Sequence, residues 1–554
     1  MSNLEPPPSP QPTVAPPAPP TDGHVLEIPW RRLNARMLIA RPLSDLVRFI
    51  PGIAVLFVLG HAQGNDWYAL IGVGVALATG VYRWFTTTFR ITAQLVQVRS
   101  GLVNRKTLTV PLDRVRTVDV TAPFLHRLLG LARVSVGTGQ SDRRNDSLRL
   151  DALSAEEADR LAGELLHRQR QVAAEEAQET GLPAAPVAAA GPAPAGAPAA
   201  AAAPAAVEVD LARFDPAWIR FGPFTLSGLL TVLVVLGFVS RYISYIHVQT
   251  LPGVQAAEQQ AAQGGLIAIV VIAALLLIVV AVLLSTIGYV VAFWGFDLSR
   301  QAEGTLRVRR GLITTRSVTI EERRLRGVEV SEPLLLRAVR GARCIAITTG
   351  LRVGRGADRG GSVLLPPAPR EVAVRVAADV IRDAQPLAAP LRPHGPVAMR
   401  RRFTRALLVG AVLCALLILG ERLAGLGVGF WIASLAVLPV AALLAWDRGR
   451  SLGHTVQDRW LVVRIGSLIR RTSVVSCDGV IGWNLHQSFF QRRLGLVTLS
   501  ATTAAGRQRY TAQDVSLREA LVTCEEGLPG LLDPFLVAAD QPSPLGPRMM
   551  SPEA

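Results

Sequence analysis

Apolar residues are concentrated in six long blocks, and the segments between the blocks are polar and basic. The blocks are residues 46–60, 67–85, 224–246, 266–296, 403–420 and 428–446. A helix needs about 20 apolar residues to cross a hydrocarbon core, and a soluble core helix is rarely apolar on every face for that length. The blocks therefore predict six transmembrane helices in three hairpins. The first block is the weakest, because Arg48 and Pro51 interrupt it. Core helices of a large soluble protein are the alternative, and they would need a covering layer on every face.

Arginine flanks the hairpins asymmetrically. Four arginines precede the first block, whereas the turn at residues 61–66 contains neither Lys nor Arg, and the other two hairpins show the same bias. Basic residues near helix ends are retained on the cytoplasmic side. We therefore expect both termini and the segments between hairpins to be cytoplasmic. The N-terminal stretch is Pro-rich and not basic then apolar, so insertion is expected to depend on the transmembrane segments themselves.

Three stretches of the sequence repeat one pattern, and each follows the second helix of a hairpin. The first and second stretches align without a gap at an offset of 210. From an opening to a closing glycine the stretches span 29, 30 and 29 residues, namely Gly101 to Gly130, Gly311 to Gly341 and Gly466 to Gly495. The sequence therefore predicts a triplicated unit of hairpin plus domain.

The local pattern within a repeat is mostly that of strands. Polar and apolar residues alternate at 94–99 and 107–110 around a turn at Ser100-Gly101, as in a β-hairpin, and further strands are expected near 115–120 and 133–138. A capping box at 154–157 opens an amphipathic helix, and helices at 371–383 and from Ser516 close the other repeats. Each domain is therefore expected to be α+β, with its strands sealed by a C-terminal helix.

The end of each repeat carries a resemblance to a known family. Residues 487–496 read QSFFQRRLGL, residues 123–131 read PFLHRLLGL, and the second repeat is more diverged. Together with the glycine before the second strand and the valine-rich third segment, this element resembles the bacterial pleckstrin-homology (PH)-like membrane proteins. The resemblance implies a bent β-sandwich capped by a helix. The expected fold is a mixed membrane protein with six transmembrane α-helices in three hairpins and three cytoplasmic α+β PH-like β-sandwich domains.

These patterns predict an order of segments along the chain. The hairpins are expected at 43–86, 216–296 and 403–447, and the domains at 87–170, 297–384 and 448–528. Four Pro- or Ala-rich segments lack the means to bury a core and are expected to be disordered or linkers, namely 1–42, 171–215, 385–402 and 529–554.

The sequence offers little chemistry for catalysis. The eight histidines form no HExxH motif, the four cysteines form no CxxC pair, and the segment 350–361 lacks the Lys-Ser/Thr of a phosphate-binding loop. We expect that loop to join two strands. No enzyme activity, cofactor, metal site or disulfide is expected. Charged residues inside the blocks are confined to edges such as Arg48, which disfavours a transport path.

Basic residues at fixed offsets in the repeats are the candidate binding site. A basic residue beside an anionic leaflet gains about 1 kcal/mol, so such clusters could hold a domain against lipid headgroups. The candidates are Arg105, Lys106, Arg114, Arg116, Arg316, Arg323, Arg324, Arg326, Arg470 and Arg471. The alternative is that they only solvate one face of a sandwich. Nucleic acid is not an expected partner, because aromatic residues for base stacking are scarce.

The sequence thus predicts a non-enzymatic protein of the bacterial plasma membrane. Its three domains are expected to bind anionic lipid headgroups, a protein partner or each other, in a scaffold or envelope-stress role. A related membrane protein and a second copy of the chain are the protein partners left open. A subunit of a transport or export system is the alternative function.

Overall fold

The computed structural model describes part of the chain. The described residues are 30–32, 36–37, 70, 73–74, 78, 81–82, 84–92, 95–101, 106–111, 117–137, 148–154, 156–158, 160–161, 163, 208–225, 266–301, 304–349, 362–424 and 428–535. Most of the first predicted hairpin, the first helix of the second, most of the Ala/Pro linker and the loop at 350–361 lie outside them.

The described elements repeat three times in the same order. The first unit contains β1 (Arg31–Arg32), β2 (Thr88–Ile91), β3 (Leu95–Ser100), β4 (Lys106–Pro111), β5 (Thr117–Ala122), α3 (Phe124–Leu128), β6 (Leu131–Gly137) and β7 (Leu148–Ser154). The second contains β8 (Val209–Arg213), η2 (Pro216–Phe224), α7 (Leu266–Phe293), β9 (Asp297–Gln301), β10 (Thr305–Arg310), β11 (Thr315–Glu321), η5 (Glu322–Arg324), β12 (Leu325–Pro333), α8 (Leu334–Ala338), β13 (Gly341–Thr348), β14 (Val363–Pro369) and α9 (Arg370–Ile381).

The third unit follows the same plan. It contains α10 (Gln385–Ala388), β15 (Arg392–Pro393), α11 (Gly395–Ala424), α12 (Val428–Ser451), β16 (Gly453–Gln457), β17 (Trp460–Ile465), β18 (Ile469–Ser476), η7 (Cys477–Gly479), β19 (Val480–His486), α13 (Phe489–Arg493), β20 (Leu496–Thr503), β21 (Arg509–Ser516), α14 (Leu517–Gly527) and η8 (Asp533–Phe535). The predicted helices α9 and α14 are confirmed, and so is the capping box, in which Ser154 and Glu157 bond each other's backbone N–H groups.

Each unit begins before its hairpin, which the sequence did not indicate. The strands β1, β8 and β15 precede the hairpin and pair antiparallel with β2, β9 and β16, the first strands after it. Parts of three predicted disordered or linker segments, 1–42, 171–215 and 385–402, are therefore strands of the sheets. The prediction failed because composition reports average polarity, whereas a two-residue strand such as Arg392–Pro393 needs only one exposed sheet edge to pair with.

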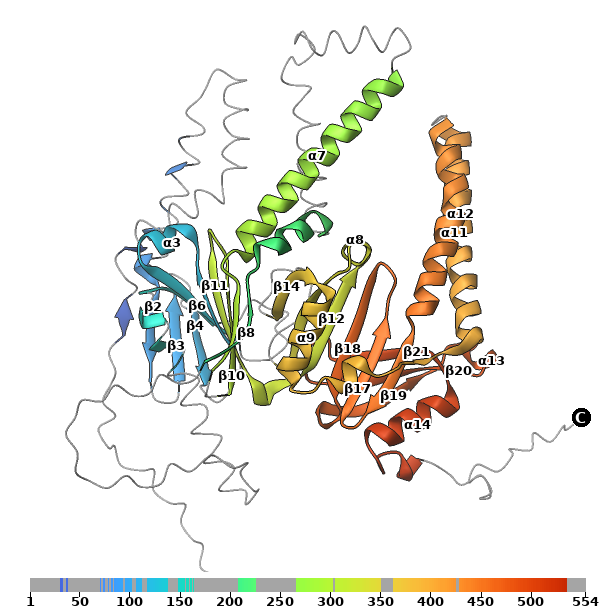
Figure 1. Cartoon of the computed structure of the whole chain (residues 1–554). Coiled ribbons are helices and arrows are strands. Elements are labelled where there is room, and N and C mark those ends of the chain that lie inside the picture. Colours follow the sequence, from blue (N-terminus) through green and yellow to red (C-terminus); the bar gives the residue numbers. More distant parts are fainter. Residues whose placement is uncertain are drawn as a thin grey trace, which may run out of the picture.

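The sheets run from one unit into the next. One seven-stranded sheet has the order β7-β6-β5-β11-β10-β9-β8, and a second has the order β14-β13-β12-β18-β17-β16-β15. Each therefore joins the last strands of one unit to the first strands of the following unit. The remaining sheets, β1-β2-β3-β4 and β19-β20-β21, lie at the two ends of the row (Figure 1).

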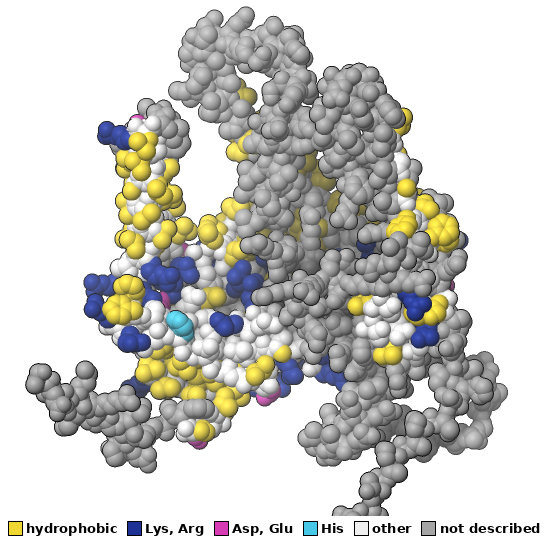
Figure 2. Space-filling model, turned by 180° about the vertical axis from the view of Figure 1, so that it is seen from behind, with side chains coloured by type: hydrophobic (Ala, Val, Ile, Leu, Met, Phe, Trp, Pro, Cys, Tyr) yellow, Lys and Arg dark blue, Asp and Glu magenta, His cyan; other side chains and the backbone are white. Residues whose placement is uncertain are grey.

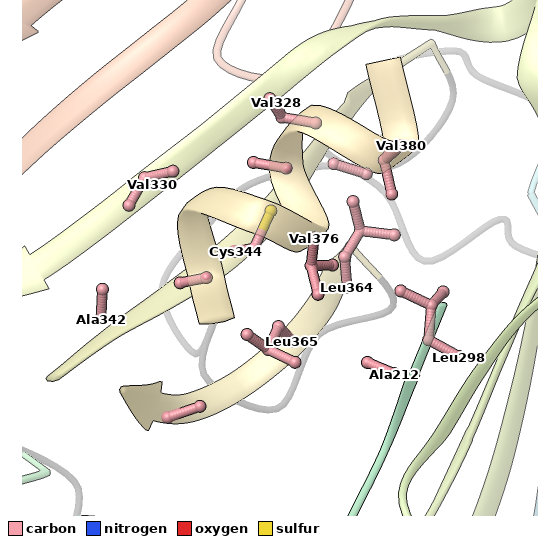
Figure 3. Close-up of a cluster of buried hydrophobic side chains, with 14 of the residues drawn as sticks. Ala212, Leu298, Val328, Val330, Ala342, Cys344, Leu364, Leu365, Val376 and Val380 are labelled. Atoms are coloured by element: carbon pink, nitrogen blue, oxygen red, sulfur yellow. The ribbon is translucent and has the colours of Figure 1, made fainter. Parts of the chain in front are cut away.

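The core of the second unit lies between its two sheets and is closed by α9. Figure 3 shows Val376 and Val380 of α9 pointing toward Leu364 and Leu365 of β14 and toward Val328 of β12. The same buried cluster extends to Trp460, Val462 and Val474 of the third unit. The second and third units therefore share a core as well as a sheet, and they are not independent domains.

The long helices α7, α11 and α12 rise from one side of the row of sheets (Figure 1). Residues 275–293 of α7 and 395–423 of α11 are long and apolar enough to span a membrane. α12 packs along α11, where a Cβ on Gly410 would lie 3.0 Å from the Cβ of Ala441, so a glycine permits the close approach. α11 begins at Gly395, earlier than the predicted Phe403, because an amphipathic Arg-bearing turn precedes its apolar part.

The turn between the short helix and the strand that follows it fixes the alignment of the repeats. Gly130, Arg340 and Gly495 occupy the same turn, with φ of 69°, 58° and 64°. The closing position of the second repeat is thus Arg340 and not Gly341, which begins β13. Each repeat therefore spans 29 residues, and the predicted span of 30 for the second was wrong.

Candidate functional site

The end of the sheets from which the long helices rise is built from turns and short helices. The backbone N–H groups of Gly311 and Leu312 donate to carbonyl oxygens of Trp294 and Val291 at the end of α7, which fixes the β10–β11 turn at the foot of that helix. α3 and α8 contact such turns. For α3, the contact is a hydrogen bond at 3.0 Å from Nη1 of Arg127 to the carbonyl oxygen of Leu312. In Figure 1, α3 and α8 lie on the side from which the long helices rise.

These short helices and turns expose large apolar side chains. The exposed residues are Phe124, Leu128, Leu312, Ile313, Leu334, Leu335, Leu468, Phe489, Phe490 and Leu494. Trp294 and Trp446, near the ends of α7 and α12, are also half exposed. Aromatic and apolar side chains at this level are typical of a bilayer interface. This end of the domains is therefore suited to dip into the headgroup region.

A basic pocket lies between α11, α12, α13 and β21, and we call it the α11 pocket. It has a volume of about 890 Å³. Its lining contains five arginines and one carboxylate, namely Arg401, Arg402, Arg405, Arg448, Arg493 and Asp514. Phe490 and Leu494 supply an apolar wall. Figure 2 shows Lys and Arg side chains gathered at the foot of the hydrophobic column that α11 and α12 form.

Asp514 anchors this pocket. Its buried carboxylate accepts hydrogen bonds from Arg401, Arg402 and Gln491. Arg401 also donates to Ser488 Oγ at 3.1 Å, at the N-terminus of α13. One carboxylate thus neutralises one of five positive charges, while Arg405 and Arg448 have no carboxylate partner among the described residues. The pocket can accept an anionic group.

A second basic pocket, of about 700 Å³, lies between η2, α8, α9 and β18. It is lined by five arginines and two glutamates, namely Arg220, Arg337, Arg340, Arg370, Arg470, Glu332 and Glu371. Arg337 and Arg470 both donate to Asp447 at the end of α12, and Arg370 donates to Glu332. Burial, together with the positive charge of Arg470, lowers the pKa of Arg464. Excess positive charge is therefore common to both pockets.

The structure does not bring the sequence-predicted basic residues together. Arg316 and Arg471 bridge units by ion pairs with Asp119 and Glu329, and Arg470 lines the second pocket. Arg323, Arg324 and Arg326 lie around η5, at the opposite end of β11 from the turn that packs on α7, and the first two pair with Glu321. Lys106 begins β4. Arg105, Arg114 and Arg116 lie outside the described residues.

The residues of the α11 pocket were visible in the sequence only as flanking charge. Arg401, Arg402 and Arg405 precede one helix of the hairpin, and Arg448 follows the other. A hairpin returns to the membrane face at which it began, so its two basic flanks must converge. Adding Arg493 from the FFQRRLG element to these flanks would have indicated the pocket.

Comparison with known proteins identifies the domains. The sequence model of the bacterial PH domain matches residues 46–169 and 404–523, which cover the first and third units. The UPF0699 transmembrane protein YdbT of Bacillus subtilis (strain 168) is 20% identical over 502 residues, which cover 88% of this chain and 96% of the relative. No solved structure matches the chain. The repeated sheets, the long apolar helices and these matches together show that the chain is a membrane protein that carries bacterial PH domains.

Proposed function

We propose that the protein binds anionic phospholipid headgroups at the inner face of the bacterial plasma membrane, with its PH-like domains held against that face. The α11 pocket carries this proposal. It places five arginines beside one carboxylate, at the level where the apolar part of α11 begins. Phosphate groups bind such clusters through charge-assisted hydrogen bonds from guanidinium groups.

The same proposal accounts for the exposed apolar side chains around the pocket. Phe489 and Phe490 on α13 stand beside Arg492 and Arg493, and Arg493 lies over the ring of Phe489 at 4.9 Å. An aromatic ring inserted at the interface with a guanidinium beside it matches the layering of acyl chain and headgroup.

The finer architecture belongs to the proposal as well. The second unit has the element order of the two matched units, so we assign it the same PH-like fold. Six membrane helices and cytoplasmic domains follow from the apolar blocks and the positive flanks of the hairpins. Transport has less support, because charged residues in α7, α11 and α12 occur only near helix ends.

Lipid binding by the purified full-length chain in detergent tests the proposal. The probe is a fluorescent short-chain phosphatidylglycerol, compared with the same label on phosphatidylcholine. The variant Arg405→Gln/Arg448→Gln/Arg493→Gln removes three exposed charges and leaves Arg401 and Arg402 on Asp514. At about 1 kcal/mol for each of the three charges, phosphatidylglycerol affinity should fall roughly 100-fold at low salt.

The matched control removes three arginines at the membrane-distal ends of strands, as Arg323→Gln/Arg459→Gln/Arg509→Gln. These residues lie in η5, in the β16–β17 turn and at the start of β21. The control should bind phosphatidylglycerol as the parent does. Equal loss in both triple variants, or equal affinity of the parent for the two lipids, would reject a specific headgroup site.

A further inference from the structure

The two joints between successive units use equivalent strands in an identical register. Val318 of β11 pairs with Asp119 of β5, and Ser473 of β18 pairs with Glu329 of β12. Val318 and Ser473 each lie seven residues after the opening glycine of their unit, and Asp119 and Glu329 each lie eighteen residues after theirs. One interface is therefore made twice within the chain.

Each joint is also held by side chains. Arg316 pairs with Asp119 across the first joint, and Arg471 reaches Glu329 at 3.5 Å across the second. Beneath the second joint, Val475 of the third unit packs with Ile347 of the second in one buried cluster. The joint is thus a paired, packed interface and not a loose contact of strand ends.

The two ends of the row of units carry the same two kinds of strand that form the internal joints. β4 is the first unit's equivalent of β11 and β18, and it is the last strand of its sheet. β19 is the third unit's equivalent of β5 and β12, and it too lies at the edge of its sheet. Neither strand has a partner on its outer side among the described residues.

The edge at β19 lacks the charged and proline residues that normally protect such a strand. Its sequence, VIGWNLH, contains no Lys, Asp, Glu or Pro, which proteins use to block edge pairing. The register shift of β19 at Val480–Gly482 also occurs in β12 at Leu325–Gly327, and β12 still pairs with β18. Leu485 is 38% exposed, whereas Val330 at the equivalent position of β12 is 4% exposed, in a buried cluster that includes Val474 of β18. Ile481 is exposed as well. The surface of β19 is therefore suited to pairing with another strand.

We propose that β4 of one molecule pairs antiparallel with β19 of a second copy of this chain, so that the protein forms head-to-tail homo-oligomers. The register of the two internal joints places Leu108 opposite Asn484 and Thr107 opposite Leu485 of the next copy. Because α7 of the second unit and α11 of the third lie on one side of the row (Figure 1), a further joint of this kind keeps the helices of neighbouring copies in one membrane.

The intermolecular joint is weaker than the internal ones. Asn484 stands where Asp119 and Glu329 supply a carboxylate, so β19 offers no carboxylate of the kind that pairs with Arg316 and Arg471 at the internal joints. Assembly is therefore expected to depend on the density of the protein in the membrane. Such a heterologous interface closes into a ring or extends as a filament, according to the rotation between copies.

Disulfide trapping in native membranes tests the proposal. The double variant Thr107→Cys/Leu485→Cys places thiols on directly opposed residues of the proposed pair, and it should give a ladder of dimers, trimers and larger species on mild oxidation. Each single variant supplies only one half of the pair and should give no ladder. Thr107→Cys/Ile481→Cys shifts one thiol by four residues, roughly 13 Å along the strand, and should stay monomeric.

The mass of the intact assembly provides a second measurement. Leu485→Lys adds a charge to the edge and should convert oligomers in mild detergent to monomers, whereas Leu517→Lys, at a somewhat more exposed leucine on α14, should not. No ladder with the opposed cysteines, an equal ladder with the shifted pair, or crosslinking only to a protein of another mass would overturn pairing between copies. This result does not depend on lipid binding at the α11 pocket.

Discussion

Arg316 donates a hydrogen bond from Nε to Oδ1 of Asp119 at 3.0 Å, and this pair joins β11 of the second unit to β5 of the first. Arg471 occupies the same position in the third unit and reaches Glu329 of the second. Basic residues at a fixed offset in the repeats therefore hold neighbouring units together. A repeated charge in a repeat protein can reflect a repeated internal interface as readily as a repeated ligand site.

Glu329→Gln should destabilise the protein at the second joint. The carboxylate is buried and accepts from Arg507 Nε at 3.1 Å, with Arg471 beside it. Burial and the nearby Arg507 already lower the pKa of Arg471, so removal of the carboxylate leaves two guanidinium groups poorly compensated. We expect a loss of about 2–3 kcal/mol. Thermal unfolding of the full chain in detergent measures it.

The control is Glu526→Gln, which removes an exposed carboxylate that pairs with Arg392 at 2.8 Å. An exposed pair contributes at most about 1 kcal/mol, so this variant should unfold close to the parent temperature. Similar shifts in the two variants would show that the joint between the second and third units contributes no more than a surface ion pair.

Arg340→Gly should stabilise the second unit. Arg340 has a φ of 58°, where Gly130 and Gly495 stand in the other units. A residue with a Cβ costs about 1–2 kcal/mol in this conformation, and glycine avoids that cost. Part of the gain is offset because glycine loses more conformational freedom on folding. We expect a net gain of about 0.5–1 kcal/mol in thermal unfolding. Arg375→Gly, on an exposed position within α9, should lose about 1 kcal/mol instead.

The residue Phe490 should sit in the lipid interface. Its side chain is exposed on α13 beside the α11 pocket, so a Phe490→Cys variant labelled with an environment-sensitive fluorophore should be quenched by brominated lipids in vesicles. The same label on Gln508→Cys, in the turn before β21, should not be quenched. The native Cys344, Cys477 and Cys524 are expected to label slowly, because burial raises the pKa of each thiol to about 11 or 12.

Local patterns in the sequence predicted the elements well, because their causes are local. Alternation predicted the β3–β4 hairpin, the capping box at 154–157 predicted a helix start in the first unit, and the helix expected from Ser516 closes the third unit. The sharing of sheets between units could not be predicted in this way. Which strand meets the outer edge of β5 depends on the packing of whole units, and nothing within residues 117–122 specifies β11 as the partner.

The sequence predicted that the candidate site is basic, but it did not predict which residues form the site. Charge counting found that the domains are basic, and Arg470 does line a basic pocket. It could not separate Arg316, which is paired internally, from Arg405, which is exposed at the foot of α11, because both are arginines at the edge of an element. Burial and ion pairing decide that difference, and both are properties of the tertiary structure.

The third unit should lose stability in mild acid because of a buried histidine pair. Nε2 of His394 lies 3.0 Å from Nδ1 of His454, and Nδ1 of His394 lies 2.7 Å from the carbonyl oxygen of Gln513. That carbonyl can only accept, so Nδ1 of His394 carries a hydrogen. In a neutral ring Nε2 then accepts from Nδ1–H of His454, whose Nε2 faces the hydroxyl of Thr523 at 3.0 Å. The hydroxyl of Thr523 donates to the carbonyl oxygen of Glu519 at 2.7 Å. Both imidazole rings are buried, and burial disfavours the charged form of each ring.

The sign of the pH effect follows from the pKa values of the two rings. Burial, reinforced by His394, lowers the pKa of His454 from 6.5 to about 4. Burial likewise lowers the pKa of His394, against the opposing influence of Glu519 and Asp514. As the pH falls, these two histidines are therefore protonated in the unfolded chain before they are protonated in the folded protein. The contribution to stability is complete above about pH 6.5 and is lost as the pH falls toward about 4, up to about 3 kcal/mol.

Unfolding temperatures of the full chain at pH 7.5 and 5.5 isolate this contribution. His454→Gln keeps a polar side chain in the site but removes the titration, so it should be less stable than the parent at pH 7.5 and should lose less on acidification. His486→Gln replaces an exposed histidine of the same unit and should show the parent's full loss. Carboxylates such as Asp514 are present in all three proteins, so their titration cannot produce the difference. An unchanged difference between the two pH values in His454→Gln would exclude the histidine pair as the cause.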